Sequence, residues 1–331
     1  MTNRKIFVSW PGYSGDDPQT GGRLAAAGYG LILAPKLGAR SESELIDLMQ
    51  DACGAIVSTD PFTAKALRAN PGLRIIARVG VGTDSIDHAA AAHHAVAISI
   101  TPGMNAQPVA DQTLAMILAL VRRVVPQDQS VKSGRWDRVG EHTPSELPGK
   151  IVGLVGAGTI GRAVAQRLRG FDVSIVYFDD QVPKLDDARR VGSLDELLAI
   201  ADIVTLHAPF VPETRHLIDA AGLSKMKPTA LLVNTARGPL IDTAALFEAL
   251  RRGAIAGAGL DVFEDEPPGA DRLKDVPNLV CSAHVGGLSH ESIRRMTVSA
   301  TDSVLAVLAG EIPATVINPD VLRTNRARSA S

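Results

Sequence analysis

Short apolar runs rich in Ile, Val and Leu recur through the first hundred residues and alternate with stretches of helical spacing. Five of these runs predict strands bounded by Gly, Pro or Ser, at residues 5–10, 29–35, 54–59, 73–80 and 95–101. Two intervening stretches, residues 41–52 and 62–70, predict helices, the first with Ser41 or Ser43 as its N-cap. This alternation is typical of a parallel sheet with helices on both faces.

The same alternation returns after residue 150 with better-defined strands. Six apolar runs predict strands at residues 151–156, 174–179, 202–208, 231–236, 256–262 and 279–284. Helical stretches at residues 161–168, 194–201 and 242–253 lie between them. Six strands linked by helices fit the two βαβ halves of a doubly wound sheet.

Two longer helices are predicted outside these alternating segments. Residues 105–125 are strongly apolar and contain no glycine, which predicts one buried helix that ends at Pro126. Residues 289–310 predict a second helix. No stretch approaches the ~18 apolar residues that a membrane span requires, and the N-terminal apolar run is too short for a signal peptide.

Composition places the chain among ordinary globular proteins. Of its 331 residues, 45% are hydrophobic and 21% are charged, and the formal net charge of -2 argues against the basic face that nucleic-acid binding requires. Cys53 and Cys281 are the only cysteines, and they lack the spacing of a disulfide framework or a zinc site. We therefore expect a cytoplasmic protein with no metal, no membrane association and no nucleic-acid partner.

The glycines at positions 156, 158 and 161 have the G-x-G-x-x-G spacing of a dinucleotide-binding turn. Gly156 would permit the tight turn, Gly158 the approach of a pyrophosphate, and Gly161 close packing of helix against strand. The next predicted strand ends in Asp179, 23 positions after Gly156 (179 minus 156), near the ~20 expected for the carboxylate that binds ribose hydroxyls. With Asp180 beside it, this carboxylate would repel a 2′-phosphate, which predicts NAD as the cofactor rather than NADP.

Because the glycine turn comes only after 150 residues, we expect its domain to be inserted into another one. The predicted fold class is α/β, with two doubly wound parallel-sheet domains. A Rossmann NAD-binding domain of residues 104–285 would lie within a flavodoxin-like substrate-binding domain formed by residues 1–103 and 286–331.

Three polar residues follow predicted strands, at the edge where such sheets bind ligands. They are Arg237, Glu266 and His284. Taken singly, each has an ordinary alternative: a surface arginine, an exposed loop acid, and a core histidine bonded to backbone. Together they suit the reduction of a 2-keto acid. The histidine would give a proton to the carbonyl oxygen, the glutamate would orient the ring and favour its protonated form, and the arginine would hold the substrate carboxylate.

These motifs resemble the D-isomer-specific 2-hydroxyacid dehydrogenases, which include phosphoglycerate dehydrogenases and reductases of hydroxypyruvate and glyoxylate. The resemblance covers nearly the whole chain and rests on RVGVGTDSID, TPGMNAQPVAD, GLVGAGTIG, LHAPFVPETRHLI, VNTARGPLID, LDVFEDEPP and HVGGLSHES. It implies an NAD-dependent oxidoreductase that interconverts a 2-keto acid and a D-2-hydroxy acid, with Arg237, Glu266 and His284 as the catalytic trio.

The resemblance also implies further site residues. Backbone N–H groups of Val81 and Gly82, in the turn that Gly80 opens, would bind the substrate carboxylate. Asp261 would accept a hydrogen bond from the nicotinamide carboxamide. The implied cofactor-binding set is Gly156, Gly158, Thr159, Ile160, Gly161, Asp179, His207, Ala208, Pro209, Thr235, Ala236, Asp261, Gly286 and Gly287.

Departures from the family bear on the substrate. Asp111 stands where many relatives have Glu, a change that should not remove function. Relatives that use 3-phosphoglycerate tend to carry an arginine in the loop where this chain has Asp60, and a carboxylate there would repel a phosphate. Arg78, by contrast, matches a basic position of those relatives. We therefore expect a small unphosphorylated acid such as glyoxylate or hydroxypyruvate.

The resemblance also bears on alternative activities and on the assembly state. Formate dehydrogenases pair the histidine with an amide, so Glu266 argues against that activity. Phosphoglycerate dehydrogenase, and an NAD-sensing protein that acts in transcriptional repression, stay as alternative functions. The resemblance further suggests a homodimer formed partly by the helix at 107–125 and the loop around Trp136.

Overall fold

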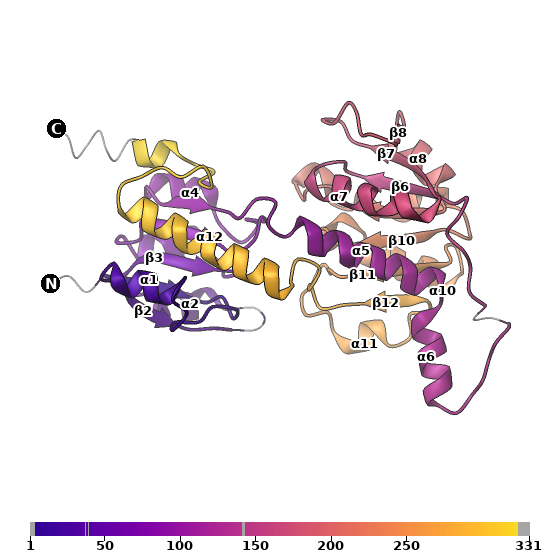
Figure 1. Ribbon diagram of the computed structural model, residues 1–331, viewed down its shortest axis with the longest axis horizontal. Coiled ribbons are helices and arrows are strands. Elements are labelled where there is room, and N and C mark those ends of the chain that lie inside the picture. Colours follow the sequence, from indigo (N-terminus) through magenta and orange to yellow (C-terminus); the bar gives the residue numbers. More distant parts are fainter. Residues whose placement is uncertain (1–3, 37, 39, 141–142, 324–331) are drawn as a thin grey trace. The chain divides into compact units, whose positions relative to one another are not determined.

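The protein divides into two compact units (Figure 1), as seen in a computed structural model that describes residues 4–36, 38, 40–140 and 143–323. Unit 1 comprises Met1–Asn105 and Ser289–Ser331, and unit 2 comprises Ala106–Leu288. Each unit is built on one parallel sheet flanked by helices, which confirms the predicted α/β fold class. The described residues contain no helix that is both long and apolar enough to cross a lipid bilayer.

Unit 1 contains a five-stranded sheet with the order β2-β1-β3-β4-β5. Its strands are β1 (Lys5–Val8), β2 (Gly30–Leu33), β3 (Ala52–Val57), β4 (Ile75–Arg78) and β5 (Ala97–Ser99). Its shorter helices are α1 (Gly21–Ala26), α2 (Glu42–Leu48), α3 (Ala64–Ala69) and α4 (His88–His93). All five strands are parallel, and their order is the flavodoxin-like one.

The helix near the chain's end, α12 (His290–Leu308), packs on β3, β4 and β5 of unit 1. Ser289 caps it, accepting a hydrogen bond from the N–H of Ser292 at 3.1 Å. Apolar residues on its inner face, among them Met296, Ala300 and Val304, join the core beneath the sheet. The segment after residue 288 therefore completes the fold of the first hundred residues.

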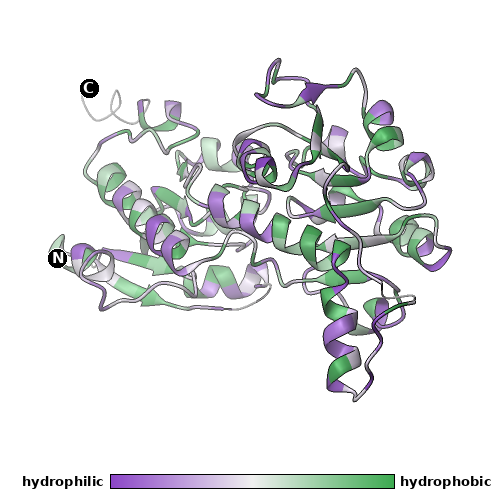
Figure 2. Ribbon diagram, turned by 45° about the vertical axis from the view of Figure 1, so that its right-hand side comes forward, coloured by the Kyte–Doolittle hydropathy of each residue, from purple (hydrophilic) through white to green (hydrophobic). Residues whose placement is uncertain are grey.

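Unit 2 contains a seven-stranded parallel sheet with the order β12-β11-β10-β9-β6-β7-β8. Its strands are β6 (Ile151–Val155), β7 (Ser174–Phe178), β8 (Arg189–Arg190), β9 (Ile203–Leu206), β10 (Leu231–Asn234), β11 (Gly257–Leu260) and β12 (Leu279–Cys281). Its helices are α5 (Ala106–Val121), α6 (Val124–Lys132), α7 (Thr159–Leu168), α8 (Leu194–Ile200), α9 (Ala220–Lys225), α10 (Thr243–Arg251) and α11 (Ala270–Leu273), with short 3₁₀ turns η1 (Arg169–Phe171), η2 (Pro212–Thr214) and η3 (Gly238–Leu240). Two apolar cores lie on the two faces of this sheet. The inner strands of this sheet are accordingly coloured mainly as hydrophobic in Figure 2, whereas the edge strand β8 (Arg189–Arg190) is hydrophilic.

The prediction of one long helix over residues 105–125 was wrong. The first helix, α5, ends at Val121, and Arg123 adopts a left-handed conformation with φ of 55°. A second helix, α6, then begins at Val124, so that Pro126 lies in its first turn, where a missing N–H costs no hydrogen bond. The α5 helix packs within unit 2 against α7, β10 and β11.

A salt bridge ties α5 to α7. Nε of Arg167 lies 2.6 Å from Oδ1 of Asp111, and Nη2 of Arg167 donates to Oε1 of Gln107 at 2.8 Å. The aspartate at position 111 is therefore long enough to bond the neighbouring helix.

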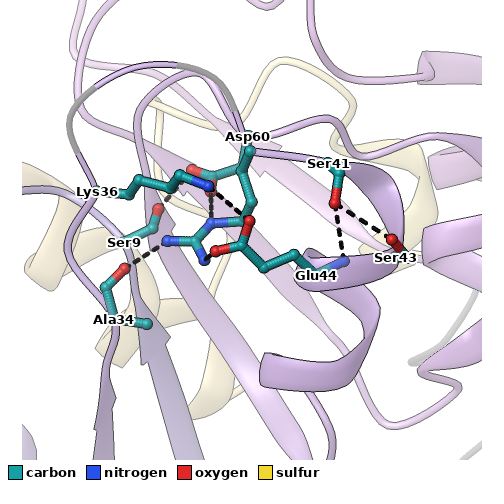
Figure 3. A network of polar contacts seen from close by, with 8 residues as sticks. Ser9, Ala34, Lys36, Ser41, Ser43, Glu44 and Asp60 are labelled. Atoms are coloured by element: carbon teal, nitrogen blue, oxygen red, sulfur yellow. Dashed lines mark hydrogen bonds and ion pairs between the residues drawn. The ribbon is translucent and has the colours of Figure 1, made fainter.

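A polar cluster lies at the carboxyl edge of the unit 1 sheet (Figure 3). Nε of Arg40 lies 2.9 Å from Oδ1 of Asp60, and the hydroxyl of Ser9 donates to Oδ2 of Asp60 at 2.5 Å. Nη1 and Nη2 of Arg40 donate to Oε1 of Glu44 at 2.8 Å and to the carbonyl of Ala34 at 2.6 Å. We call Ser9, Arg40, Glu44 and Asp60 the Arg40 cluster.

The Arg40 cluster corrects the argument that Asp60 would repel a substrate phosphate. Asp60 is only 6% exposed and Arg40 only 7% exposed. Because both oxygens of Asp60 are bonded and its charge is paired with Arg40, this carboxylate presents no free negative charge to a ligand. Asp60 therefore has a structural role in unit 1, and its charge gives no argument against a phosphorylated substrate.

Candidate active site

The unit 2 residues singled out from the sequence all follow strands of one parallel sheet. The glycine turn follows β6, Asp179 follows β7, His207 follows β9, Arg237 follows β10, and His284 follows β12. Because parallel strands end at the same edge, the carboxyl edge of this sheet gathers them. Ligands of doubly wound sheets bind at this edge.

The glycine turn leaves no room for side chains at two of its positions. Gly156 has φ of +96°, and a Cβ built on it would lie 2.7 Å from the carbonyl carbon of His207. A Cβ on Gly161 would collide with the carbonyl oxygen of Gly156. A Cβ on Gly158 would meet nothing within 4 Å, so the turn is open in that direction.

The start of α7 is suited to an anion. Its N-cap is Gly158, which has no side chain to bond the first N–H groups of the helix. Thr159 and Ile160 form its first turn. The uncapped N–H groups and the positive end of the helix dipole fit a pyrophosphate placed in the open direction of Gly158.

Asp179 is held in place by main-chain donors. Its Oδ2 accepts from Ala157 N of the glycine turn at 2.7 Å, and its Oδ1 accepts from Gln181 N at 2.8 Å and Val182 N at 2.9 Å. Partial burial opposes ionisation, but these three bonds and the charge of Arg190 hold the pKa of Asp179 below its usual range. The residue is a fixed negative charge beside the turn, which suits ribose hydroxyls.

His207 packs against the glycine turn as a neutral ring. Burial lowers its pKa to about 3. Its Nε2 lies 3.2 Å from the hydroxyl of Thr205, while its buried Nδ1 has no hydrogen-bond partner among the described residues. A buried, unpartnered ring nitrogen next to an open anion-binding turn fits a site that a ligand completes. The residues present therefore fit a dinucleotide such as NAD.

His284 and Glu266 form a hydrogen-bonded pair. Nδ1 of His284 lies 2.7 Å from Oε2 of Glu266, and the side chains are 40% and 35% exposed. The other carboxylate oxygen, Oε1, accepts from Phe263 N at 3.1 Å. His284 adopts a left-handed backbone conformation with φ of 52°. The pairing leaves Nε2 as the ring nitrogen available for proton transfer.

The pKa of Glu266 depends on both of its predicted partners, His284 and Arg237. Burial opposes its ionisation, but the hydrogen bond and charge of His284, the Phe263 N–H and the charge of Arg237 outweigh that effect and keep the pKa of Glu266 below its usual range. The structure thus brings the trio of Arg237, Glu266 and His284 to one part of the carboxyl edge.

Arg237 is positioned by the turn that follows β10. Nδ2 of Asn234, at the end of that strand, donates to the carbonyl of Arg237 at 2.8 Å, and Nη1 of Arg237 donates to the carbonyl of Ala236 at 2.7 Å. The arginine is half-buried. Nearby Thr235 is buried, and its hydroxyl lies 2.8 Å from that of Thr113.

Asp261 organises the loop that carries His284. Its Oδ1 accepts from the Ser282 hydroxyl and from Val285 N at 3.0 Å, and its Oδ2 accepts from Gly286 N at 2.8 Å. Its carbonyl accepts from His284 N at 2.7 Å. Asp261 is 1% exposed, and three donors already bind its carboxylate oxygens. It fixes both sides of the histidine turn, a role that the sequence analysis missed; its contact with a carboxamide stays a prediction.

A second pair supports the segment that carries Glu266. Nε2 of His216 lies 2.7 Å from Oε1 of Glu264, and Oε2 of Glu264 accepts from Thr243 N at 3.1 Å. Partial burial opposes ionisation, yet these bonds lower the pKa of Glu264. The pair joins the start of α10 to the segment around residue 264. Nothing in the spacing of the sequence marks His216 as a partner of Glu264.

In unit 1, the turn at Gly80–Gly82 is shaped by Arg78. The Arg78 guanidinium donates to the carbonyls of Val79 and of Gly82, the latter at 3.0 Å. Gly80 N donates to the hydroxyl of Thr101 at 3.0 Å, and Gly80 has φ of +142°. Val81 is 43% exposed. The basic residue before this turn therefore has a structural role.

Comparison with known proteins agrees with this geometry. Residues 114–286 match the family model described as D-isomer specific 2-hydroxyacid dehydrogenase, NAD binding domain. The chain is 41% identical over 292 residues to a glyoxylate reductase of Thermofilum pendens, with 86% of each chain covered.

Two solved structures show the same likeness over nearly the full length. One is a D-lactate dehydrogenase of Aquifex aeolicus complexed with NAD and lactic acid, with a TM-score of 0.82 and 29% identity over 95% of this chain and 99% of that one. The other is an NADPH-dependent glyoxylate/hydroxypyruvate reductase of Sinorhizobium meliloti, with a TM-score of 0.81 and 31% identity over 96% and 98%. The chain therefore belongs to the D-isomer-specific 2-hydroxyacid dehydrogenases, NAD-dependent oxidoreductases that interconvert 2-keto acids and D-2-hydroxy acids.

Proposed function

We propose that the chain reduces a small unphosphorylated 2-keto acid, such as glyoxylate or hydroxypyruvate, with His284 as the proton donor. The observation that carries this proposal is the 2.7 Å contact between His284 and Glu266, with the charge of Arg237 acting on the same carboxylate. The names of relatives support the substrate class, since the 41% identical protein is a glyoxylate reductase.

The trio divides the work on the substrate. NADH held at the glycine turn and Asp179 would supply the hydride that the carbonyl carbon needs. His284 gives the proton on Nε2 to the carbonyl oxygen, which completes the hydroxyl group. Glu266 holds Nδ1 and so keeps the ring oriented toward the carbonyl oxygen. In the oxidation direction, the neutral ring accepts the hydroxyl proton.

Arg237 holds the substrate carboxylate. Its planar guanidinium binds a carboxylate with two parallel hydrogen bonds and polarises the adjacent carbonyl. Asn234 bonds the backbone carbonyl of Arg237, and the carbonyl of Ala236 accepts from Nη1 of its guanidinium, so both the turn and the side chain are held in place.

The remaining predicted site residues are proposed in their predicted roles. Residues 104–285 form the NAD-binding domain, and residues 1–103 with 286–331 form the substrate-binding domain. In the first, the cofactor contacts are the glycine turn, Asp179, the loops at 207–209 and 235–236, and Asp261. Gly286 and Gly287, directly after the last residue of this domain, complete the cofactor site. In the second, backbone N–H groups of Val81 and Gly82 bind the substrate carboxylate.

An assay with a panel of 2-keto acids tests the substrate. The purified chain is mixed with NADH and with glyoxylate, hydroxypyruvate, pyruvate or 3-phosphohydroxypyruvate, and loss of NADH absorbance is followed. We expect the first two acids to give the largest kcat/KM. A preference for the phosphorylated acid would favour phosphoglycerate dehydrogenase, and NADH binding without turnover on any acid would favour the NAD-sensing alternative.

We also propose that the chain is a cytoplasmic homodimer. The exposed apolar side chains of unit 2 support a partner surface on α6 and the loop after it, where Val131 is 50% exposed, Trp136 75% and Val139 83%. The α5 helix is mostly buried within its own unit, so this surface replaces it in the proposal. Trp136→Ser should shift the mass measured by light scattering from dimer to monomer, while Val211→Ser, at a 40% exposed valine elsewhere in unit 2, should not.

A further inference from the structure

The edge of unit 2 brings a guanidinium next to the carboxylate at position 179. Strand β8 pairs in parallel with β7, with Tyr177 opposite Arg190. Nη2 of Arg190 donates to the carbonyl oxygen of Asp179 at 2.8 Å. Arg190 is exposed to solvent. Its position is thus set both by strand pairing and by a direct bond to Asp179.

The adjacent arginine on the same strand, Arg189, forms an ion pair with another residue. Nη1 of Arg189 lies 3.3 Å from Oε1 of Glu196, which itself accepts from Gly192 N. Successive side chains of a strand point to opposite faces, so the two arginines differ in surroundings. Arg190 has no carboxylate within ion-pair distance in the described part of the chain. Its direct bond is to a neutral carbonyl, so its charge, which also acts on Asp179 at longer range, can attract a further anion.

The charges of Asp179 and Arg190 favour different nucleotides. A carboxylate beside the glycine turn suits the free ribose 2′-hydroxyl of NAD, whereas a nearby arginine accommodates the 2′-phosphate of NADP. In the sequence, no arginine comes immediately after Asp179 and Asp180. Sheet pairing instead brings one from 11 residues further on.

We propose that Arg190 is a specificity-determining residue that binds the 2′-phosphate of NADP. The chain then accepts NADP(H) beside NAD(H), and the balance between Asp179 and Arg190 sets the ratio. Asp179 repels the phosphate, and Arg190 offsets this repulsion with charge-assisted hydrogen bonds. This inference rests on the proposed placement of a dinucleotide at the glycine turn.

Binding of nucleotide fragments tests the proposal without relying on catalysis. Adenosine 2′,5′-bisphosphate and 5′-AMP differ by the 2′-phosphate and carry no nicotinamide. We expect Arg190→Gln to raise the Kd for the bisphosphate about tenfold, the loss of one charge-assisted contact at an exposed site, and to leave the Kd for 5′-AMP unchanged in titration calorimetry. Arg189→Gln is the matched control and should change neither Kd. Arg190→Gln should likewise raise the Kd for NADPH and leave the Kd for NADH unchanged.

The outcomes separate this inference from the proposed function. Equal affinity of the parent and Arg190→Gln for the bisphosphate, with normal 5′-AMP binding, overturns the role of Arg190 alone. Failure of the parent to bind either fragment overturns it together with the nucleotide site. Selective loss of bisphosphate affinity in Arg190→Gln supports it, even in a preparation that reduces none of the 2-keto acids tested.

Discussion

The two sheets of this protein each carry a hydrogen-bonded pair of a carboxylate and a basic side chain in the loops after their strands, with opposite results. In unit 1, Arg40 and Asp60 are nearly inaccessible, and their polar atoms are bonded within the Arg40 cluster and to the carbonyl of Ala34. In unit 2, the side chains of Glu266 and His284 are 35% and 40% exposed, and their contact uses only one ring nitrogen. Residue type is similar in both places; exposure and unused hydrogen-bonding capacity separate a group that stabilises the fold from one that acts on a ligand.

The largest expected effect is on turnover at the unit 2 pair. His284→Asn should lower kcat by about 10²–10⁴-fold, since a positioned acid contributes that much. The Kd for NADH, measured by fluorescence titration, should stay unchanged. Ordinary turnover by this variant would remove His284 as the proton donor.

The unit 1 pair should respond in stability instead. Arg40→Ala leaves Asp60 buried without its partner, which should reduce the free energy of unfolding by about 3–5 kcal/mol in urea denaturation. The exposed pair of Arg323 and Asp320 offers a control in the same unit, because Arg323→Ala should cost less than about 1 kcal/mol. If Arg40→Ala kept full stability and instead weakened substrate binding, the contrast between the two sheets would be wrong.

Arg237 tests whether the half-buried cation of unit 2 binds the substrate. Arg237→Ala should raise KM for the keto acid and lower kcat/KM by about 10–100-fold, the worth of charge-assisted hydrogen bonds. Arg237→Lys should recover part of this loss, because it restores the charge but not the planar fork. Unchanged kcat/KM in the alanine variant, at normal NADH affinity, would refute the anchoring role.

The smallest expected effect is on the loss of stability at low pH. The folded-state pKa values of Glu264 and Glu266 lie below the ordinary value of 4.5. Their contribution to stability is therefore fully present above that value and is lost as pH falls through the lowered folded-state values. Glu264→Gln should flatten the loss of stability below pH 4.5, followed by circular dichroism; Glu311→Gln, on the surface of unit 1, serves as the control. If the stability of Glu264→Gln fell with pH in parallel with that of the parent, Glu264 would not contribute to the acid sensitivity.

Sequence reasoning succeeded where a local pattern fixes the backbone. The glycine spacing at 156–161 and the apolar runs that end at Asp179 or His284 follow from steric limits and from burial within a parallel sheet, both of which are visible in a short window. Ser41 proved to be the cap of α2, accepting from Glu44 N.

The features that the sequence analysis did not predict depend on more than a local pattern. A left-handed arginine at position 123 has no signature in its neighbours, and the alanine-rich α4 lacks the apolar stripe that marks a helix. The pairing of Asp60 with Arg40, of Asp261 with the loop after Ser282, and of Arg190 with Asp179 depends on contacts across the sheet. Such contacts decide whether a charged residue is buried, shared or free, and no local spacing encodes them.

The left-handed backbone of His284 also constrains which residues evolution can try there. Side chains branched at Cβ are strongly disfavoured at a φ of 52°, whereas asparagine and glycine enter this region readily. A lineage that abandoned the chemistry could therefore keep the loop intact with asparagine but not with valine or isoleucine. An inactive relative of this chain should thus be recognisable by a small amide or a glycine at this one position, with the surrounding turn preserved.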